Sequence, residues 1–456
     1  MDNEAAANQE DSPLQKEDFG QEFKWGVSTA AYQIEGAHTA DGKGASIWDE
    51  FTQRKGKIQR GHHANHTCDF YNRYPQDLEL MQALHIPCFR FSFSWPRIIP
   101  EGTGAVNTKG LDYYDRLLDN CLQRNIEPWV TLYHWDLPAA LEKRGGWANR
   151  DIVSWFQEYV SLCAQKFGDR VKHWMVLNEP MAFVGAGYFL GVHAPGRREL
   201  GAFLAAAHHA SLCQAEGGRI LKQLLPHAEV GTTFSCSHLE PYRPLERDRN
   251  ATRRVDALLN RLFLEPSLGL GYPVADVPYL RRIEKYFAPG DEARLAFDFD
   301  FIGLQNYTRE LVRYSFFTPF LQAKLVPAPK RKVPHTVMKW EIHPEAIYQV
   351  LKKYSAYAGV KKIIITENGA AFPDTVVYGQ VHDLQRKQYL QDHLQQVLRA
   401  KQEGVNVQGY FVWSFTDNFE WAEGYHPRFG LVYVDFETQQ RIVKASGQWY
   451  SQFLQP

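Results

Sequence analysis

Short apolar runs alternate with longer amphipathic stretches about eight times along the chain. The apolar runs fall at 23–30, 88–95, 128–135, 171–179, 229–235, 300–307, 362–367 and 407–415. Runs of this length are typical of strands buried on both faces. Apolar residues at helical spacing mark the stretches 74–85, 112–125, 151–167, 201–225, 253–263, 344–357 and 383–403. This alternation predicts a single (β/α)8 TIM barrel over residues 19–456, with its active site at the carboxyl ends of the strands.

The N-terminal residues 1–18 are polar and mostly acidic, so we expect them to form a disordered tail. They contain no apolar segment of the kind that a secretory signal requires. No window of the chain is long and apolar enough to predict a membrane span. We therefore expect a cytoplasmic protein without a membrane partner. The 456 residues could make two or three domains, but no shift in composition marks a boundary.

Charge and cysteine spacing exclude several classes of function. A formal net charge of −1 gives no reason to expect a nucleic-acid partner. The 6 cysteines form no CxxC pair, and no HExxH motif occurs, so we expect neither a metal nor a cofactor. His208 and His209 lie within the predicted helix 201–225, away from the strand ends, and we interpret them as structural.

Polar and aromatic residues recur where the predicted strands end. Glu367 directly follows the apolar run 362–366, and Glu179 ends the run 171–179. Taken alone, each could be a capping or ion-paired carboxylate, but the shared placement indicates a convergent pair. Because barrel strands end at one mouth, we expect one pocket there. It would be ringed by Gln33, His134, Trp135, Asn178, Glu179, Tyr307, Glu367 and Trp413.

Two carboxylates among amide and Trp side chains fit cleavage of a glycosidic bond. One carboxyl must be protonated to donate to the leaving oxygen, and the other must be ionised to attack the anomeric carbon or to activate a water. Gln33, His134 and Asn178 suit sugar hydroxyls, while Trp413 and Trp421 offer flat faces to a pyranose. For each Trp, core packing is the alternative. The residues alone leave open which carboxylate is the acid.

The segment 314–336 follows neither the helical nor the strand pattern. It carries four cationic side chains and four prolines before Thr336. We interpret it as a solvated surface loop. The alternative is a basic rim at the barrel mouth that favours acidic or polar leaving groups. The cations are Lys324, Lys330, Arg331 and Lys332.

From Phe23 to about Trp449 the chain resembles glycoside hydrolase family 1. The motifs that carry the resemblance are FKWGVSTAAYQIEG, RFSFSWPRI, TLYHWDLP, NEP, ITENG and WSFTDNFEWAEGYHPRFGLVYVDF. The resemblance implies a retaining mechanism, with Glu179 as the acid/base, Glu367 as the nucleophile and about 5–5.5 Å between their carboxyl groups. It implies that Tyr307 and Arg90 hold the nucleophile and that Asn178 binds the 2-hydroxyl. The other implied sugar-site residues are Gln33, His134, Trp135, Trp413, Glu420, Trp421 and Phe429, with Trp340 meeting the aglycone.

Two positions depart from the usual motifs of the family. Gln305 stands where the usual motif has Asn, and Lys339 stands where it has Gly. Members that cut 6-phosphorylated sugars carry Ser, Lys and Tyr where this chain has Glu420, Pro427 and Phe429. Because a carboxylate repels phosphate, we expect unphosphorylated substrates. Glu179, which is Gln in the plant thioglucosidases, argues against that activity.

The resulting hypothesis is a retaining exo-β-glycosidase, foremost a β-glucosidase, with side activity on β-galactosides and β-fucosides. Its partner would be a small β-glucoside or a short oligosaccharide. The alternatives are a catalytically silent sugar-binding protein on the same fold and an enzyme that acts mainly as a transglycosylase. The sequence leaves the natural aglycone and the oligomeric state open.

Overall fold

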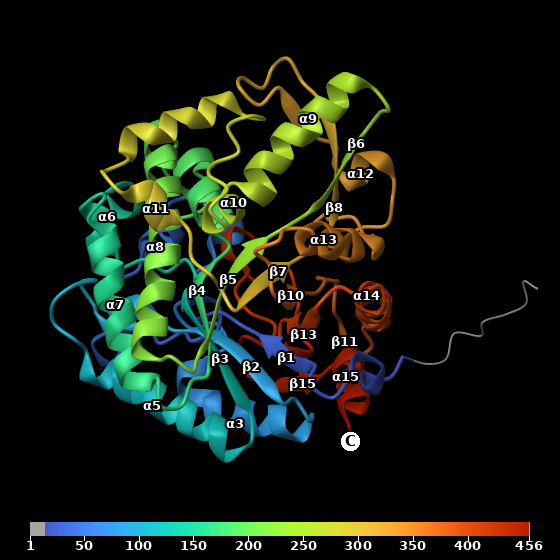
Figure 1. Ribbon diagram of the computed structural model, residues 1–456. Coiled ribbons are helices and arrows are strands. Elements are labelled where there is room, and N and C mark those ends of the chain that lie inside the picture. The colour runs from blue at the N-terminus through green and yellow to red at the C-terminus, as the bar shows by residue number, and fades with distance from the viewer. Residues whose placement is uncertain (1–13, 456) are drawn as a thin grey trace, which may run out of the picture.

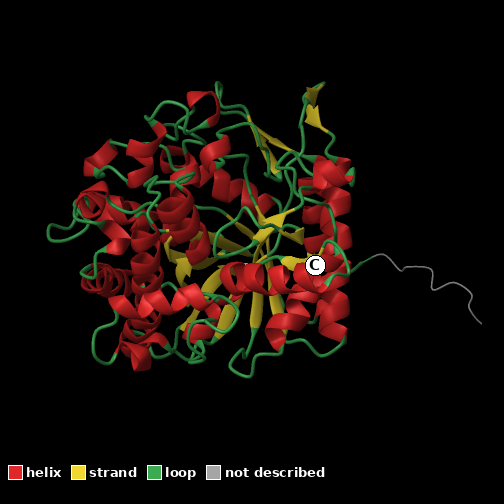
Figure 2. Ribbon diagram, turned by 90° about the horizontal axis from the view of Figure 1, so that it is seen from above, coloured by secondary structure: helices red, strands yellow, loops and turns green. Residues whose placement is uncertain are grey.

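The computed structural model describes residues 14–455, which contain a closed barrel of eight parallel strands (Figures 1 and 2). The barrel order is β1-β13-β10-β7-β5-β4-β3-β2, and β1 pairs with β13 to close it. Each predicted apolar run overlaps one barrel strand, which confirms the predicted fold. The strands are β1 Lys24–Ser28, β2 Cys88–Ser92, β3 Glu127–Tyr133, β4 His173–Asn178, β5 Glu229–Ser235, β7 Phe301–Gln305, β10 Ile363–Asn368 and β13 Val407–Trp413.

Helices surround the barrel in Figure 1. The longer ones are α3 Phe70–Ala83, α5 Thr108–Gln123, α7 Ile152–Phe167, α8 Leu200–Leu224, α13 Glu345–Ser355, α14 Leu384–Gln402 and α15 Ala445–Leu454. The prediction of a helix at 253–263 is wrong at its start. That region begins with α9 Glu246–Asp256 and continues as the π-helix η6 Ala257–Arg261. The first turns of α9 are almost entirely polar, so they carry no apolar stripe that a sequence pattern could register.

Shorter elements connect these layers. They are η1 Lys16–Phe19, α1 Ala31–Ile34, η2 Ala40–Gly42, α2 Ile47–Thr52, η3 Gln59–Gly61, α4 Trp95–Ile98, α6 Ala139–Lys143, η4 Gly146–Ala148, η5 Ala182–Leu190, α10 Leu264–Ser267, η7 Pro278–Tyr286, α11 Asp291–Leu295 and η8 Trp421–Glu423. Two small hairpins pair β11 Val376–Val377 with β12 Gln380–Val381, and β14 Val432–Val434 with β15 Arg441–Val443.

Side chains fill the barrel interior in layers. A middle layer of buried residues comprises Cys88, Trp129, Met175, Phe301, Ile364 and Phe411. Gly231 leaves room for this layer, since a Cβ there would lie 2.4 Å from the Phe301 ring. Below it, the first residues of several strands form a floor of ion pairs. The floor consists of Lys24, Glu127, His173, Glu229 and Lys362. The packed lower layers close the barrel interior beneath the carboxyl ends of the strands.

The segment predicted as an irregular solvated loop, 314–336, contains regular structure. Above the barrel mouth, β6 His238–Pro241, β8 Arg309–Tyr314 and β9 Ala323–Leu325 form a small sheet, and α12 Ala328–Arg331 follows (Figure 1). Lys324, Lys330 and Lys332 are exposed, as predicted, but Arg331 is not. Its side chain is 8% exposed and pairs with Glu341 at 2.9 Å. A cation committed to a buried carboxylate does not contribute to a basic rim.

The described part of the predicted tail is ordered from residue 16 onward. Lys16, in η1, donates from its amine to the carbonyl of Leu454 at 3.1 Å. The prediction of disorder for residues 1–13 lies outside the described residues. Within residues 14–455, no helix is long and apolar enough to cross a membrane. All six cysteines are buried free thiols.

Candidate active site

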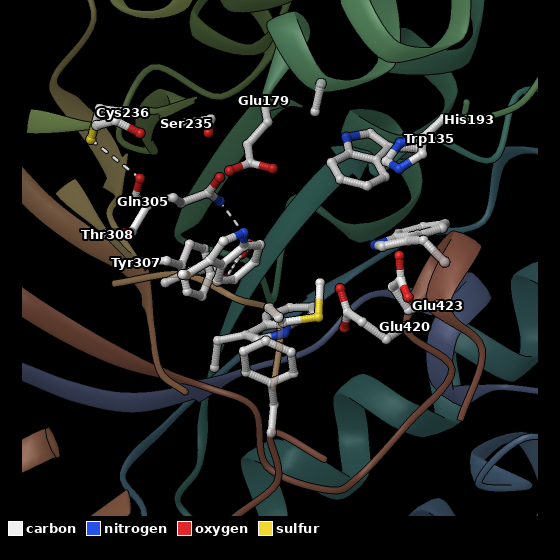
Figure 3. A pocket seen from close by; sticks show the side chains of 18 of the residues that line it. Trp135, Glu179, His193, Ser235, Cys236, Gln305, Tyr307, Thr308, Glu420 and Glu423 are labelled. Atoms are coloured by element: carbon white, nitrogen blue, oxygen red, sulfur yellow. Dashed lines mark hydrogen bonds between the residues drawn. The ribbon is translucent and has the colours of Figure 1, made fainter. Parts of the chain in front are cut away.

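A cavity of about 340 Å³ opens at the carboxyl ends of the barrel strands (Figure 3). Ten of the predicted site residues line it. They are His134, Trp135, Glu179, Tyr307, Trp340, Glu367, Trp413, Glu420, Trp421 and Phe429. The other three, Gln33, Arg90 and Asn178, are fully buried and hydrogen-bond to lining residues from behind.

Glu367 is the most heavily hydrogen-bonded carboxylate of the cavity. It ends β10 among side chains of the neighbouring strands, so its contacts come from β2 and from the end of β7. Its Oε1 accepts from Arg90 and, at 2.8 Å, from the Gln305 amide. Its Oε2 accepts from the Tyr307 hydroxyl at 2.6 Å. Burial raises the pKa of Glu367, but Arg90 and Tyr307 oppose that rise.

Glu179 also points into the cavity (Figure 3) but occupies a different environment. It follows the end of β4 with a φ of 46°, a left-handed conformation that is uncommon outside glycine. Burial and the nearby Glu367 raise the pKa of Glu179 well above its usual range, with only weak opposition from Ser235 and Arg90. The pKa rises at both carboxyls, and it rises more at Glu179. Unequal environments of this kind divide two carboxyls into an acid and a base.

Asn178 connects both sides of the cavity through its side chain. Its Oδ1 accepts from Arg90, from Thr233 at 2.9 Å and from Gln305 at 2.6 Å. Its amide nitrogen must therefore be the group that faces His134 Nε2, 3.0 Å away. Burial, followed by the charge of Arg90, lowers the pKa of His134 well below its usual range. His134 is thus a neutral imidazole whose Nδ1 carries the proton.

The loop after β13 brings Glu420 and Trp421 to the cavity. Gln33 donates to Glu420 Oε2 at 3.3 Å and to the carbonyl of Phe419 at 2.9 Å. Burial, with a smaller contribution from Glu367, raises the pKa of Glu420 to about 8. Asp417 anchors the loop, because it accepts from Lys444 at 2.6 Å, from Arg428 at 2.6 Å and from the backbone of Gly430 at 3.0 Å.

Aromatic rings form two walls of the cavity. On one wall, Trp421 packs on Trp135 with ring centroids 4.4 Å apart, and His134 lies between Trp413 and Trp421 at about 6 Å from each. On the other, Trp340 lies 5.2 Å from the Tyr307 ring and 6.1 Å from Phe429. Flat apolar faces beside buried polar groups are suited to a sugar, which has both kinds of surface.

Several lining residues were not predicted from the sequence. Ser235, Cys236 and Ser237 end β5 or follow it, and the rule of strand ends could have found them. The others have no such signal: Ala182, His193, Thr308, Glu310, Met338, Ala422 and Glu423. Lys339, a departure from the family pattern, is exposed and does not line the cavity.

Gln305, the longer amide in place of the family's Asn, hydrogen-bonds to both Glu367 and Asn178.

His208 and His209 are structural, as interpreted. His208 contacts Asp291 at 2.8 Å and Tyr272 at 3.1 Å, and His209 contacts the carbonyl of Trp147 at 2.9 Å.

Comparison with known proteins identifies relatives along nearly the whole chain. The sequence model of the family described as Glycosyl hydrolase family 1 matches residues 15–456. Beta-glucosidase A of Thermotoga maritima is 46% identical over 435 residues, which are 95% of this chain and 97% of that protein. The 1,4-beta-D-glucan glucohydrolase of Thermotoga neapolitana is 44% identical over 438 residues, which are 96% and 98% of the two chains.

A solved structure also matches nearly the whole chain. The beta-glucosidase from Thermotoga maritima in complex with deoxynojirimycin has a TM-score of 0.92 at 44% identity and covers 95% of this chain and 98% of its own. The match therefore extends over nearly the whole of both chains, in sequence and in structure. The chain belongs to glycosyl hydrolase family 1.

Proposed function

We propose that the protein is a retaining exo-β-glucosidase that hydrolyses unphosphorylated β-glucosides. The observation that carries the proposal is the unequal setting of two carboxyls in one cavity. Glu367 accepts hydrogen bonds from three side chains, which favour its ionised form. Glu179 has no comparable donors among the described residues, and its raised pKa favours the protonated form.

The first chemical step uses both groups. The Glu367 carboxylate attacks the anomeric carbon while Glu179 donates its proton to the glycosidic oxygen, so the aglycone leaves as a neutral alcohol. The product is a glycosyl ester on Glu367. Arg90, Gln305 and Tyr307 hold the attacking carboxylate in place, which limits the entropy cost of reaching the transition state.

In the second step the roles of Glu179 reverse. As a carboxylate, it takes a proton from a water, which attacks the anomeric carbon and releases the sugar with its original β configuration. A sugar acceptor in place of water would give transglycosylation by the same route. Loss of the aglycone leaves room for either nucleophile on the Glu179 side.

Buried polar atoms without partners among the described residues support a sugar as the ligand. Gln33 Oε1 and His134 Nδ1 are two such atoms, an acceptor and a donor. Burying such groups is costly unless a ligand pairs with them. The ionised form of Glu420, beside Gln33, would accept from the 4- and 6-hydroxyls and would oppose a 6-phosphate. Asn178 would bind the 2-hydroxyl.

Initial rates on a panel of p-nitrophenyl glycosides test the proposal. We expect fast release from the β-glucoside, slower release from the β-galactoside and β-fucoside, and at least 100-fold slower release from β-glucoside 6-phosphate, because the described lining of the cavity offers the buried phosphate no lysine or arginine. Proton NMR of the first sugar formed should show the β anomer. Release of the α anomer, or no release by a folded chain, would contradict the proposal.

A further inference from the structure

The cavity has more carboxyl groups than the proposed reaction uses. Its described lining residues include five glutamates and no lysine or arginine. Glu179 and Glu367 carry out the chemistry, and Glu420 faces the sugar. Glu423 is exposed at the rim, which leaves Glu310 as a half-buried carboxyl without an assigned role.

Glu310 lies on the aglycone side of the cavity. It is in β8, three residues after Tyr307, where its neighbour Thr308 donates to the carbonyl of Glu341 at 3.2 Å. Glu341 directly follows Trp340, the aromatic residue expected to meet the aglycone. Figure 3 shows Thr308 across the cavity from Glu420, and therefore away from the side that holds Gln33.

The neighbouring arginines do not neutralise Glu310. Side chains alternate along a strand, so the side chain of Arg309 points away from the cavity and pairs with Glu341 at 2.6 Å and with Glu240 at 3.3 Å. Arg331 is likewise committed to Glu341. The structure gives Glu310 no ion pair and no side-chain hydrogen bond with any described residue. Burial raises the pKa of Glu310 to about 7, with only partial opposition from Arg331.

We propose that Glu310 sets the charge preference of the aglycone subsite, so that aglycones bearing an amine or a donor hydroxyl react faster than those bearing a carboxylate. An unpaired, half-buried carboxyl gains a partner when such an aglycone binds, whereas an anionic aglycone meets the like charge of the ionised Glu310. The inference rests on the proposed glucosidase activity, since it concerns the leaving group of that reaction.

Three aryl β-glucosides of similar shape test this preference at pH 8, where Glu310 is mostly ionised because the pH is above its pKa of about 7. Their aglycones are 4-aminomethylphenol, 4-methylphenol and 4-carboxyphenol, which are cationic, neutral and anionic there. The quantity measured is kcat/KM for the cationic substrate divided by that for the anionic one, each normalised to the neutral substrate. Because leaving-group reactivity is the same for every variant, a change in this ratio reports on the protein.

Glu310→Gln should lower the ratio by about tenfold, the size expected when one partly desolvated charge is removed. Glu423→Gln is the matched control, because it removes an exposed carboxyl from the same cavity, and it should change the ratio by less than about threefold. Active-site titration with an activated 2-deoxy-2-fluoro-β-glucoside counts the competent enzyme in each preparation. A loss of activity caused by misfolding of Glu310→Gln is therefore not mistaken for a change in charge preference.

Two results would overturn the inference. One is a ratio that Glu310→Gln leaves unchanged, and the other is an equal fall in Glu423→Gln, which would assign the preference to the general field of the cavity. Both differ from failure of the proposed function, in which the wild-type enzyme cleaves none of the three substrates.

Discussion

Replacing Tyr307 by Phe removes one hydroxyl from the cavity and keeps the ring that packs on Trp340. The lost bond is the 2.6 Å donation to Glu367 Oε2. A hydrogen bond to a charged group contributes about 1.5–3 kcal/mol. If that stabilisation supports the ionised nucleophile, kcat/KM for p-nitrophenyl β-glucoside should fall by about 10- to 150-fold.

The same substitution should shift the pH dependence. Tyr307 lowers the pKa of Glu367, so its removal raises that pKa further. The reaction needs Glu367 ionised, and kcat/KM increases as pH rises through its pKa. The acid limb of kcat/KM against pH should therefore move about one to two units toward higher pH.

Tyr348→Phe is a matched control for this variant. It also removes a tyrosine–glutamate hydrogen bond, the 2.7 Å contact with Glu403 between α13 and the end of α14, away from the cavity. The control should leave both the rate and the acid limb unchanged. A Tyr307→Phe enzyme within threefold of the wild-type rate, with its acid limb unmoved, would refute the reasoning that this bond supports the nucleophile.

Three further predictions follow from the described contacts. Glu179→Ala should lower kcat/KM for both 2,4-dinitrophenyl β-glucoside and methyl β-glucoside, and the loss should be at least tenfold larger for the methyl glucoside, because only its poor leaving group needs a proton. Equal losses for the two substrates in stopped assays would count against the acid role. Contact with Glu127 and Glu229 outweighs burial and raises the pKa of His173 in the folded protein. The charged imidazole therefore stabilises the wild type below pH 6.5, and this stabilisation, which His173→Gln should remove, is lost as pH rises through the folded pKa. If urea unfolding from pH 5 to 9 gave a constant difference between the free energies of unfolding of the two proteins, this prediction would be contradicted. Glu341→Ala should lower the free energy of unfolding by about 3 kcal/mol, because it leaves Arg309 and Arg331 without their buried partner; a loss below 1 kcal/mol in urea would contradict a structural role for the pair.

The barrel could be predicted because its strands are buried on both faces. Such strands give apolar runs, and all eight runs overlap a barrel strand. The small sheet of β6, β8 and β9 gave no such signal. Its strands are short and half-buried, with charged residues such as Arg309 and Glu310 among them. A sequence pattern therefore predicts a buried strand of the barrel more readily than a half-buried strand that pairs at the rim of the barrel.

For the site as well, the sequence predicts the positions of residues on their own strands but not their contacts with other strands. The position of Glu179 and Glu367 at strand ends predicts that they meet, whereas their unequal surroundings depend on side chains from other strands. Gln305 is an example, because nothing in its local sequence shows that it bridges Glu367 and Asn178. The anchor at Asp417 likewise needs Lys444, from the start of the last helix. These contacts join residues that only the folded barrel brings together.

Azide rescue of Glu367→Ala and Glu179→Ala tests the central claim, the division of roles between the two carboxyls, most directly. Azide can enter the space left by each side chain and attack the sugar from that side. With 2,4-dinitrophenyl β-glucoside, we predict that Glu367→Ala yields α-glucosyl azide and that Glu179→Ala yields β-glucosyl azide. The opposite pair of products, or the same anomer from both variants, would contradict the assignment of Glu367 as nucleophile and Glu179 as acid/base.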